Sequence, residues 1–93
     1  MSGYVVVHVT PLDGEKFAAY SAVAGPSVAK HGGEFLCKGP AEMLHGNVIG
    51  KNMVIIKFDN KEAAKAWYQS DEYQAIIPTR NEGAETSFIL AGE

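Results

Sequence analysis

The run KNMVIIKFDNKEAAKAWYQSDEY, residues 51–73, changes its hydrophobic period midway. Residues 52–58 are rich in aliphatic side chains and predict a strand. From Asp59 the apolar residues recur three and four positions apart, and Asp59 with Glu62 has the spacing of a capping box, which predicts a helix. A strand therefore leads directly into a helix, and Trp67 is the expected anchor of the buried helix face.

The chain before this run predicts a strand and then a helix. Residues 4–10, YVVVHVT, are rich in valine and are followed by turn residues, so they predict a strand. Apolar residues at helical spacing follow from position 14 to position 31. Gly25-Pro26 is expected to kink or restart this helix, and Gly32-Gly33 is expected to end it.

A short strand and a long connection are predicted next. Residues 34–38 follow Gly32-Gly33 and predict a second strand that ends at Gly39-Pro40. The segment Gly39–Gly50 has no regular period, and Met43 and Leu44 within it are expected to extend the strand or to pack as a flap. Connections of this length inside a compact domain are uncommon and often functional.

The carboxy-terminal part predicts one more short helical segment and a final strand. Ser70 is placed to cap a segment 71–77 that ends before Pro78, and residues 86–91, TSFILA, predict the last strand. The order is therefore β-α-β-β-α-β within one expected domain, residues 1–93. This order favours an α+β, ferredoxin-like fold: a four-stranded antiparallel sheet with strand order 4-1-3-2 and two helices on one face.

The two central strands are apolar on both sides, although two helices cover only one side of a sheet. Their second face would carry Tyr4, Val6, Met53 and Ile55. An uncovered face of this kind has roughly 350 Å² in plan, comparable with the largest apolar patch that monomers usually expose. We therefore expect this face to pair with a second copy of the chain, giving a dimeric α/β barrel.

Composition argues against several partners. The 93 residues are 46% hydrophobic and 20% charged, with a net charge of -3, which is typical of an ordinary globular protein and disfavours nucleic acid or an anionic membrane as a partner. The run at 51–58 resembles the position of an RNA-recognition octamer, but Met53 and Ile55 offer no aromatic surface for base stacking. The amino terminus has no leader pattern, and a cytoplasmic location is expected.

Four residues are candidates for binding a small organic ligand. His8 and Lys57 are expected on the sheet face turned away from the helices, with Lys38 as a further candidate. Histidine titrates near neutral pH and a partly desolvated lysine approaches it, so the two could orient an acidic substrate. In the structural alternative, His8 is a hydrogen-bonded interface residue, and Lys57 reaches solvent or pairs with a carboxylate at the barrel rim. Arg80 either clamps a ligand carboxylate or pairs with a nearby glutamate on the surface, Glu82 or Glu85.

The remaining cysteine, histidine and aromatic side chains are expected to have structural rather than catalytic roles. Cys37, the single cysteine, is expected to be a small buried apolar side chain, and His45 is expected to be an ordinary loop histidine. Because the three histidines are scattered and no phosphate-binding loop or serine elbow is present, no metal or cofactor is expected. The tyrosines and Trp67, at helical spacing, are expected in the core.

A set of residues along nearly the whole chain resembles the family called domain of unknown function 1330. The most specific piece is AAKAWYQSDEYQ, residues 63–74. The full set is Tyr20, Gly25-Pro26, His31-Gly32-Gly33-Glu34-Phe35, Phe58, Ala63-Ala64, Ala66-Trp67-Tyr68, Ser70, Glu72-Tyr73-Gln74 and Arg80. The resemblance implies a ferredoxin-like fold in the dimeric α+β barrel superfamily and supplies no function.

The chain departs from the family pattern at three positions. The pattern tends to have arginine where Lys38 stands, glutamate near His45, and glutamate where Lys57 stands. A charged site at these positions in relatives would be altered here.

Two functional classes remain open. The first is a non-catalytic module that binds a small ligand or serves in assembly, favoured because no dense catalytic constellation is present. The second is a cofactor-independent enzyme, similar to isomerases and monooxygenases of the same superfamily, acting on a small organic acid or phenol.

Overall fold

The computed structural model describes residues 2–47 and 51–92, which form a four-stranded sheet and four helices. The elements in chain order are β1 (Gly3–Pro11), α1 (Gly14–Lys30), β2 (Glu34–Pro40), β3 (Asn52–Phe58), α2 (Lys61–Gln69), α3 (Asp71–Gln74), α4 (Ile77–Gly83) and β4 (Ala84–Gly92). No helix within these ranges is long and apolar enough to cross a lipid bilayer.

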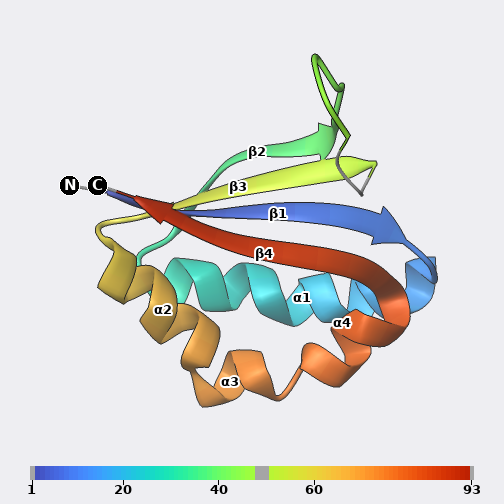
Figure 1. The fold of residues 1–93 in the computed structure, drawn as a ribbon. Helices are drawn as coiled ribbons and strands as arrows, with labels where there is room; N and C mark the ends of the chain where they lie inside the picture. The colour runs from blue at the N-terminus through green and yellow to red at the C-terminus, as the bar shows by residue number, and fades with distance from the viewer. Residues whose placement is uncertain (1, 48–50, 93) are drawn as a thin grey trace.

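The sheet has the predicted strand order. Its order is β2-β3-β1-β4, every neighbouring pair is antiparallel, and the helices lie together on one face (Figure 1). The Cα atoms span 32 × 30 × 16 Å, and the smallest extent suits one sheet packed on one helical layer. The ferredoxin-like fold is therefore confirmed, with four helices on the covered face where two were expected.

The central strands β1 and β3 present opposite faces to different surroundings. Val5, Val7 and Val9 are buried against the helices together with Ile56 and Phe58. The alternate residues form cross-strand rows on the other face, which the helices leave uncovered. These rows run Ala91–Tyr4–Lys57–Glu34, Ile89–Val6–Ile55–Cys37 and Ser87–His8–Met53–Gly39. We call this surface the outer face.

Helix α1 continues through Gly25-Pro26, so the predicted interruption is wrong. Proline removes one backbone donor, but the usual clash of its ring with the Cβ of the preceding residue is absent when that residue is glycine. The helix ends at Lys30 with His31 as its C-cap, directly before the predicted stop at Gly32-Gly33, and Gly32 adopts a positive φ of 77°.

Helix α2 begins one residue later than predicted. Asn60 rather than Asp59 is the N-cap, and its Oδ1 accepts a hydrogen bond from the backbone N–H of Ala63 at 2.8 Å. Both side chains can cap a helix, and the extended backbone of Asn60 decides between them. Glu62 therefore lies in the first turn and not at the third position of a capping box with Asp59.

The segment after Ser70 contains two helices where one was expected. Ser70 caps α3, accepting a hydrogen bond from the backbone N–H of Tyr73 at 3.3 Å. Pro78 does not end the helical segment; it lies in the first turn of α4, where the missing proline N–H has no partner to lose. Helix α4 carries Arg80 into the covered side of the sheet.

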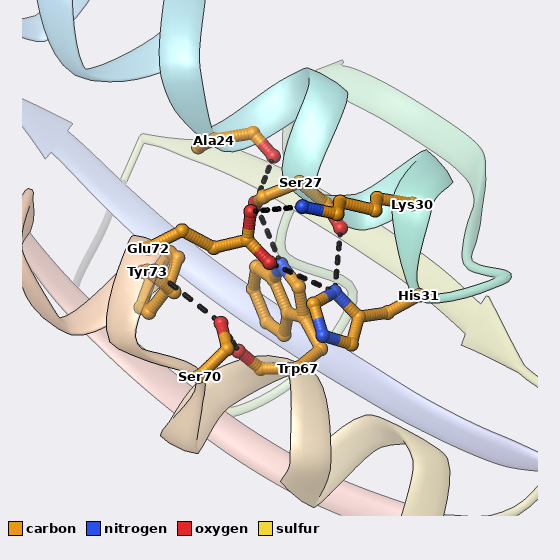
Figure 2. Close-up of polar contacts among 8 residues, drawn as sticks. All are labelled: Ala24, Ser27, Lys30, His31, Trp67, Ser70, Glu72 and Tyr73. Carbon is orange, nitrogen blue, oxygen red and sulfur yellow. Dashed lines mark hydrogen bonds and ion pairs between the residues drawn. The ribbon is translucent and has the colours of Figure 1, made fainter.

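Trp67 connects α2 to α1, as expected of the anchor residue. Its side chain is 1% exposed, and its indole N–H donates a hydrogen bond to Ser27 Oγ at 2.9 Å (Figure 2). Ser27 in turn donates to the carbonyl of Ala24 at 2.7 Å. Nearby, Glu72 on α3 forms an ion pair with Lys30 on α1 at 3.3 Å.

Strand β2 carries a bulge that the sequence did not indicate. Phe35 pairs with Ile56, but Cys37 rather than Leu36 pairs with Ile55. Cys37 is consequently exposed on the outer face, so its predicted burial is wrong for this chain.

The connection after β2 leaves the sheet. Figure 1 shows it standing out on the side of the sheet opposite the helices. Met43 and Leu44 are exposed, Leu44 by 93%, so neither extends the strand or packs as a flap within the chain. His45 lies in a bend in this connection and is also exposed. Residues 48–50, the last residues of the predicted connection, lie outside the described residues.

Candidate ligand site

A pocket of about 340 Å³ lies between α1 and the sheet. Its floor is aliphatic and comes from the covered face of β1 and β3, through Val7, Val9, Val54 and Ile56. Five aromatic side chains from four elements complete the wall: Phe17, Tyr20, Phe35, Trp67 and Phe88. The pocket therefore offers mainly apolar contacts to an occupant.

Few polar side chains line this pocket, and none of those described is acidic. The lining includes Lys38 from β2, Asn52 from β3, Thr86 from β4, and Ser21 with Tyr20 from α1. Lys38 Nζ lies 4.8 Å from the centre of the Phe35 ring. The whole chain has a net charge of -3, but the charged side chain in the described pocket wall is the cation Lys38. This positive charge favours an anionic occupant.

The bulge in β2 turns Lys38 toward the pocket. With strict alternation from Phe35, position 38 would lie on the outer face. The extra residue shifts the register, so Lys38 pairs with Val54 on the covered face. Phe35 and Lys38 consequently share one side of the strand.

Arg80 lies behind the pocket wall without a carboxylate partner among the described residues. It is 9% exposed, and Nη1 donates hydrogen bonds at 3.1 Å to both Tyr68 Oη and Tyr73 Oη. Its guanidinium carbon is 4.8 Å from the centre of the Phe88 ring. The predicted surface pairing of Arg80 is not present among the described residues, because Glu82 pairs with Lys16 at 2.6 Å and no ion pair joins Arg80 to Glu85.

Tyr73 Oη continues this network to Tyr20. The two hydroxyl oxygens are 2.7 Å apart, and Tyr20 lines the pocket. Burial raises the pKa of Tyr20 and of Tyr73, so both phenols are neutral at physiological pH. Burial acts to lower the pKa of Arg80, but its hydrogen bonds to Tyr68 and Tyr73 outweigh burial and raise it. The network therefore carries one positive charge.

His8 and Lys57 lie away from the pocket. Both are on the outer face, in rows separated by four residues along β1 and β3, which is roughly 13 Å at 3.3 Å per residue. They are therefore too far apart to hold one small molecule within a single chain. His8 instead borders an open hollow of about 420 Å³ with Glu85, Thr86 and Ser87.

Of the four predicted candidates, Lys38 alone is in the described lining of the pocket. Arg80 lies behind the wall and supports it. Tyr20 is buried in the core as predicted, but its position in the pocket wall was not predicted. One signal was available: Tyr20 and Tyr73 each carry a hydroxyl that needs a partner when buried. In residues 2–47 and 51–92, no group of three His, Cys, Asp or Glu side chains is arranged to hold a metal ion.

The fold and this pocket define a small ferredoxin-like protein with an apolar cavity beneath its sheet. Residues 2–93 match the family described as Domain of unknown function (DUF1330), and the chain belongs to that family. A comparison with curated proteins gives no match.

Solved structures share the fold at low sequence identity. RPA0582, a protein of unknown function from Rhodopseudomonas palustris, has a TM-score of 0.76 at 19% identity, over 99% of this chain and 82% of that chain. SnoaB, a cofactor-independent oxygenase from Streptomyces nogalater, has a TM-score of 0.71 at 11% identity, over 99% and 92%. A dimeric protein of unknown function from Bacteroides fragilis has a TM-score of 0.55 at 13% identity, over 99% and 96%.

Proposed function

We propose that this chain binds a small, flat, mostly apolar organic acid in the pocket between α1 and the sheet. The pocket itself carries the proposal. Its volume of about 340 Å³ falls at the lower end of the roughly 300–1,000 Å³ typical of ligand sites. A cavity of roughly 150 Å³ holds benzene, so this pocket has room for two fused rings.

Lys38 is the proposed partner of the acidic group. It is an exposed residue in the wall, so its ammonium can pair with a carboxylate while the rings contact the aromatic and aliphatic side chains below. The absence of acidic side chains from the described lining supports this polarity, because a carboxylate would meet no like charge there.

Lys38→Met is expected to weaken binding of 2-naphthoate by about 2- to 5-fold, the effect of losing one exposed ion pair. Binding of the neutral analogue 2-naphthalenemethanol is expected to stay the same. The measurement is the ligand-induced rise in melting temperature, confirmed by calorimetric titration.

Lys57→Met is the matched control, because it removes the same charge from the outer face. If both lysine variants weaken naphthoate equally, general charge rather than the pocket attracts the ligand. If neither naphthalene compound binds the wild type and no other aromatic acid or phenol in a small panel does so, the proposed function is wrong.

A second candidate is a cofactor-independent enzyme acting on a phenol or small organic acid. The observation that favours it is the hydroxyl network of Tyr20, Tyr73 and Arg80 beside the pocket, because perturbed pKa values cluster at functional sites. SnoaB, which has a similar fold, is described as a cofactor-independent oxygenase. Oxygen uptake above the uncatalysed rate with electron-rich phenols, lost in Tyr20→Phe, would support this class.

We also propose that the chain forms a homodimer through its outer face. The row Ile89–Val6–Ile55–Cys37 makes a continuous apolar band across all four strands. A stable interface buries roughly 800 Å² per partner, more than the roughly 350 Å² plan area of the sheet. The protruding connection with Met43 and Leu44 lies on the same side and would supply further contact area.

Val6→Glu is expected to convert the dimer to monomers at micromolar concentration, because two buried carboxylates would face one apolar interface without partners. Sedimentation velocity measures the result. Val23→Glu is the control: it makes the same change at a residue 43% exposed on α1 and should leave the dimer intact. A wild type that sediments as single chains at this concentration would refute the dimer.

A further inference from the structure

The hydrogen bonds that lead from Arg80 through Tyr73 to Tyr20 have a defined direction. Arginine only donates, so Tyr73 Oη accepts from Arg80 Nη1 at 3.1 Å. The positive charge favours a Tyr73 proton that points away from Arg80, and the Tyr20 oxygen is 2.7 Å away as its acceptor. Tyr73 then donates to Tyr20.

This direction leaves the hydroxyl proton of Tyr20 at the end of the chain of bonds. Among the described residues, Tyr20 Oη has a hydrogen bond to Tyr73 and to no other group. Tyr20 is also the member of this network that lines the pocket, since Tyr68, Tyr73 and Arg80 are not part of its wall. The last donor of the network therefore belongs to a residue of the pocket wall.

The charge of the network suits an anionic acceptor. Arg80 is almost fully buried, and its contacts are two phenol oxygens, the Asn81 side chain and the faces of aromatic rings. Hydrogen bonds in such a chain polarise one another, so a buried cation at one end strengthens the donor at the other. Bonds from a hydroxyl to an oxyanion are about twice as strong as those between neutral groups.

We propose that the pocket selects aromatic hydroxy acids and that Tyr20, polarised by Arg80 through Tyr73, donates a hydrogen bond to the oxygen of the ligand hydroxyl. The ligand binds with this oxygen as the phenolate, and the hydroxyl proton is released to solvent on binding. This inference rests on the proposed function and adds the second polar contact of the ligand. Lys38 and Tyr20 belong to different elements of the wall, β2 and α1, so we place the carboxylate and the hydroxyl at different ends of the molecule. Tyr20 is a binding residue, and Tyr73 and Arg80 are positioning residues.

The test compares three ligands of one shape. They are 6-hydroxy-2-naphthoate, 6-methoxy-2-naphthoate and 2-naphthoate, titrated into the full chain by calorimetry and by absorbance. Ionised naphthols absorb at longer wavelength than neutral ones, so the spectrum reports the protonation of the bound hydroxyl. The wild type is expected to bind the hydroxy ligand at least about 10-fold more tightly than 2-naphthoate, because hydrogen bonds to charged groups are the strong ones. It is also expected to shift the spectrum of the hydroxy ligand toward the phenolate.

Two variants separate binding from structure. Tyr20→Phe keeps the ring and should remove the preference for the hydroxy ligand while binding 2-naphthoate within about 2-fold of the wild type. Tyr73→Phe keeps both Tyr20 and Arg80 but breaks the chain between them. It should return the bound spectrum toward the neutral form, an effect that simple loss of packing does not produce.

Two results overturn the inference and leave the pocket proposal standing. One is a wild type that binds the hydroxy ligand no more tightly than 2-naphthoate. The other is a Tyr20→Phe variant that keeps the hydroxy preference. Failure of the wild type to bind any of the three ligands overturns both proposals.

Discussion

Trp67→Ala is expected to lower the free energy of unfolding by about 3–5 kcal/mol, the range for removing a large buried aromatic side chain. Trp67 is 1% exposed and packs against Phe58 and Tyr73, with ring centres 5.6 and 4.5 Å away. Its removal would leave a void where α2 meets the sheet and would leave Ser27 without its partner from α2. Chemical denaturation monitored by far-ultraviolet circular dichroism measures the change.

Ser27→Ala separates the hydrogen bond from the packing. It removes the acceptor of the indole N–H and leaves the ring in place (Figure 2), so it should destabilise by only about 1–3 kcal/mol, the cost of an unsatisfied buried donor. If Ser27→Ala lowers the free energy of unfolding as much as Trp67→Ala does, the hydrogen bond rather than the burial of the ring stabilises the contact between α2 and α1. If Trp67→Ala costs less than about 1 kcal/mol, the anchor assignment is wrong, since that is below the range for any buried aromatic truncation.

Gly83→Ala is expected to destabilise the fold by about 3 kcal/mol, the upper part of the range for overpacking. A Cβ at Gly83 would lie 2.6 Å from the backbone nitrogen of Phe17 and 2.8 Å from its Cα. Backbone atoms cannot move aside as a flexible side chain can. The carbonyl of Gly83 also accepts hydrogen bonds from the N–H groups of Leu12 and Asp13, at 2.9 and 3.0 Å, which hold the two segments together.

Gly14→Ala is the matched control for this substitution. Gly14 begins α1, and a Cβ there has no neighbour within 4 Å. Alanine should leave the stability within about 0.5 kcal/mol of the wild type or raise it, because it restricts the unfolded chain. Equal melting temperatures for the two variants would show that α4 can move away from α1 at little cost.

The fold could be predicted because its signals are local. Residues 52–58 and 61–69 change period within the run quoted first, and valine-rich β1 has apolar residues on both sides. Once the element order was known, the handedness of crossovers left few arrangements, and strand order 4-1-3-2 was the favoured one. Family membership follows from the same residues, and the match over residues 2–93 confirms it.

The errors arose where a local signal had two outcomes. Proline at position 26 breaks most helices, but the preceding glycine lets α1 continue. Proline at position 78 suits the first turn of a helix as well as the end of one, so α4 was missed. In both cases the packing of the segment against the sheet selects the outcome.

The candidate site was predicted only in part. The bulge in β2, which faces Lys38 toward the pocket, has no marker such as glycine at Leu36. The partners of Arg80 lie 12 and 7 residues away along the chain, on different helices, and only the fold joins them to Tyr20. Spacing in the sequence pointed instead to nearby glutamates. The homodimer, the ligand and the cytoplasmic location stay predictions.

By itself, the sequence determined the covered and uncovered faces of the sheet and the burial of Trp67, because each follows from periodicity over a few neighbouring residues. It also determined the strand order, because the order of the elements and the handedness of crossovers leave few arrangements. Only the tertiary structure decided which polar side chains meet. It separates His8 from Lys57 and brings Arg80, Tyr73 and Tyr20 into one network, because such contacts depend on the register of strands and the packing of helices. Neither is encoded in spacing along the chain.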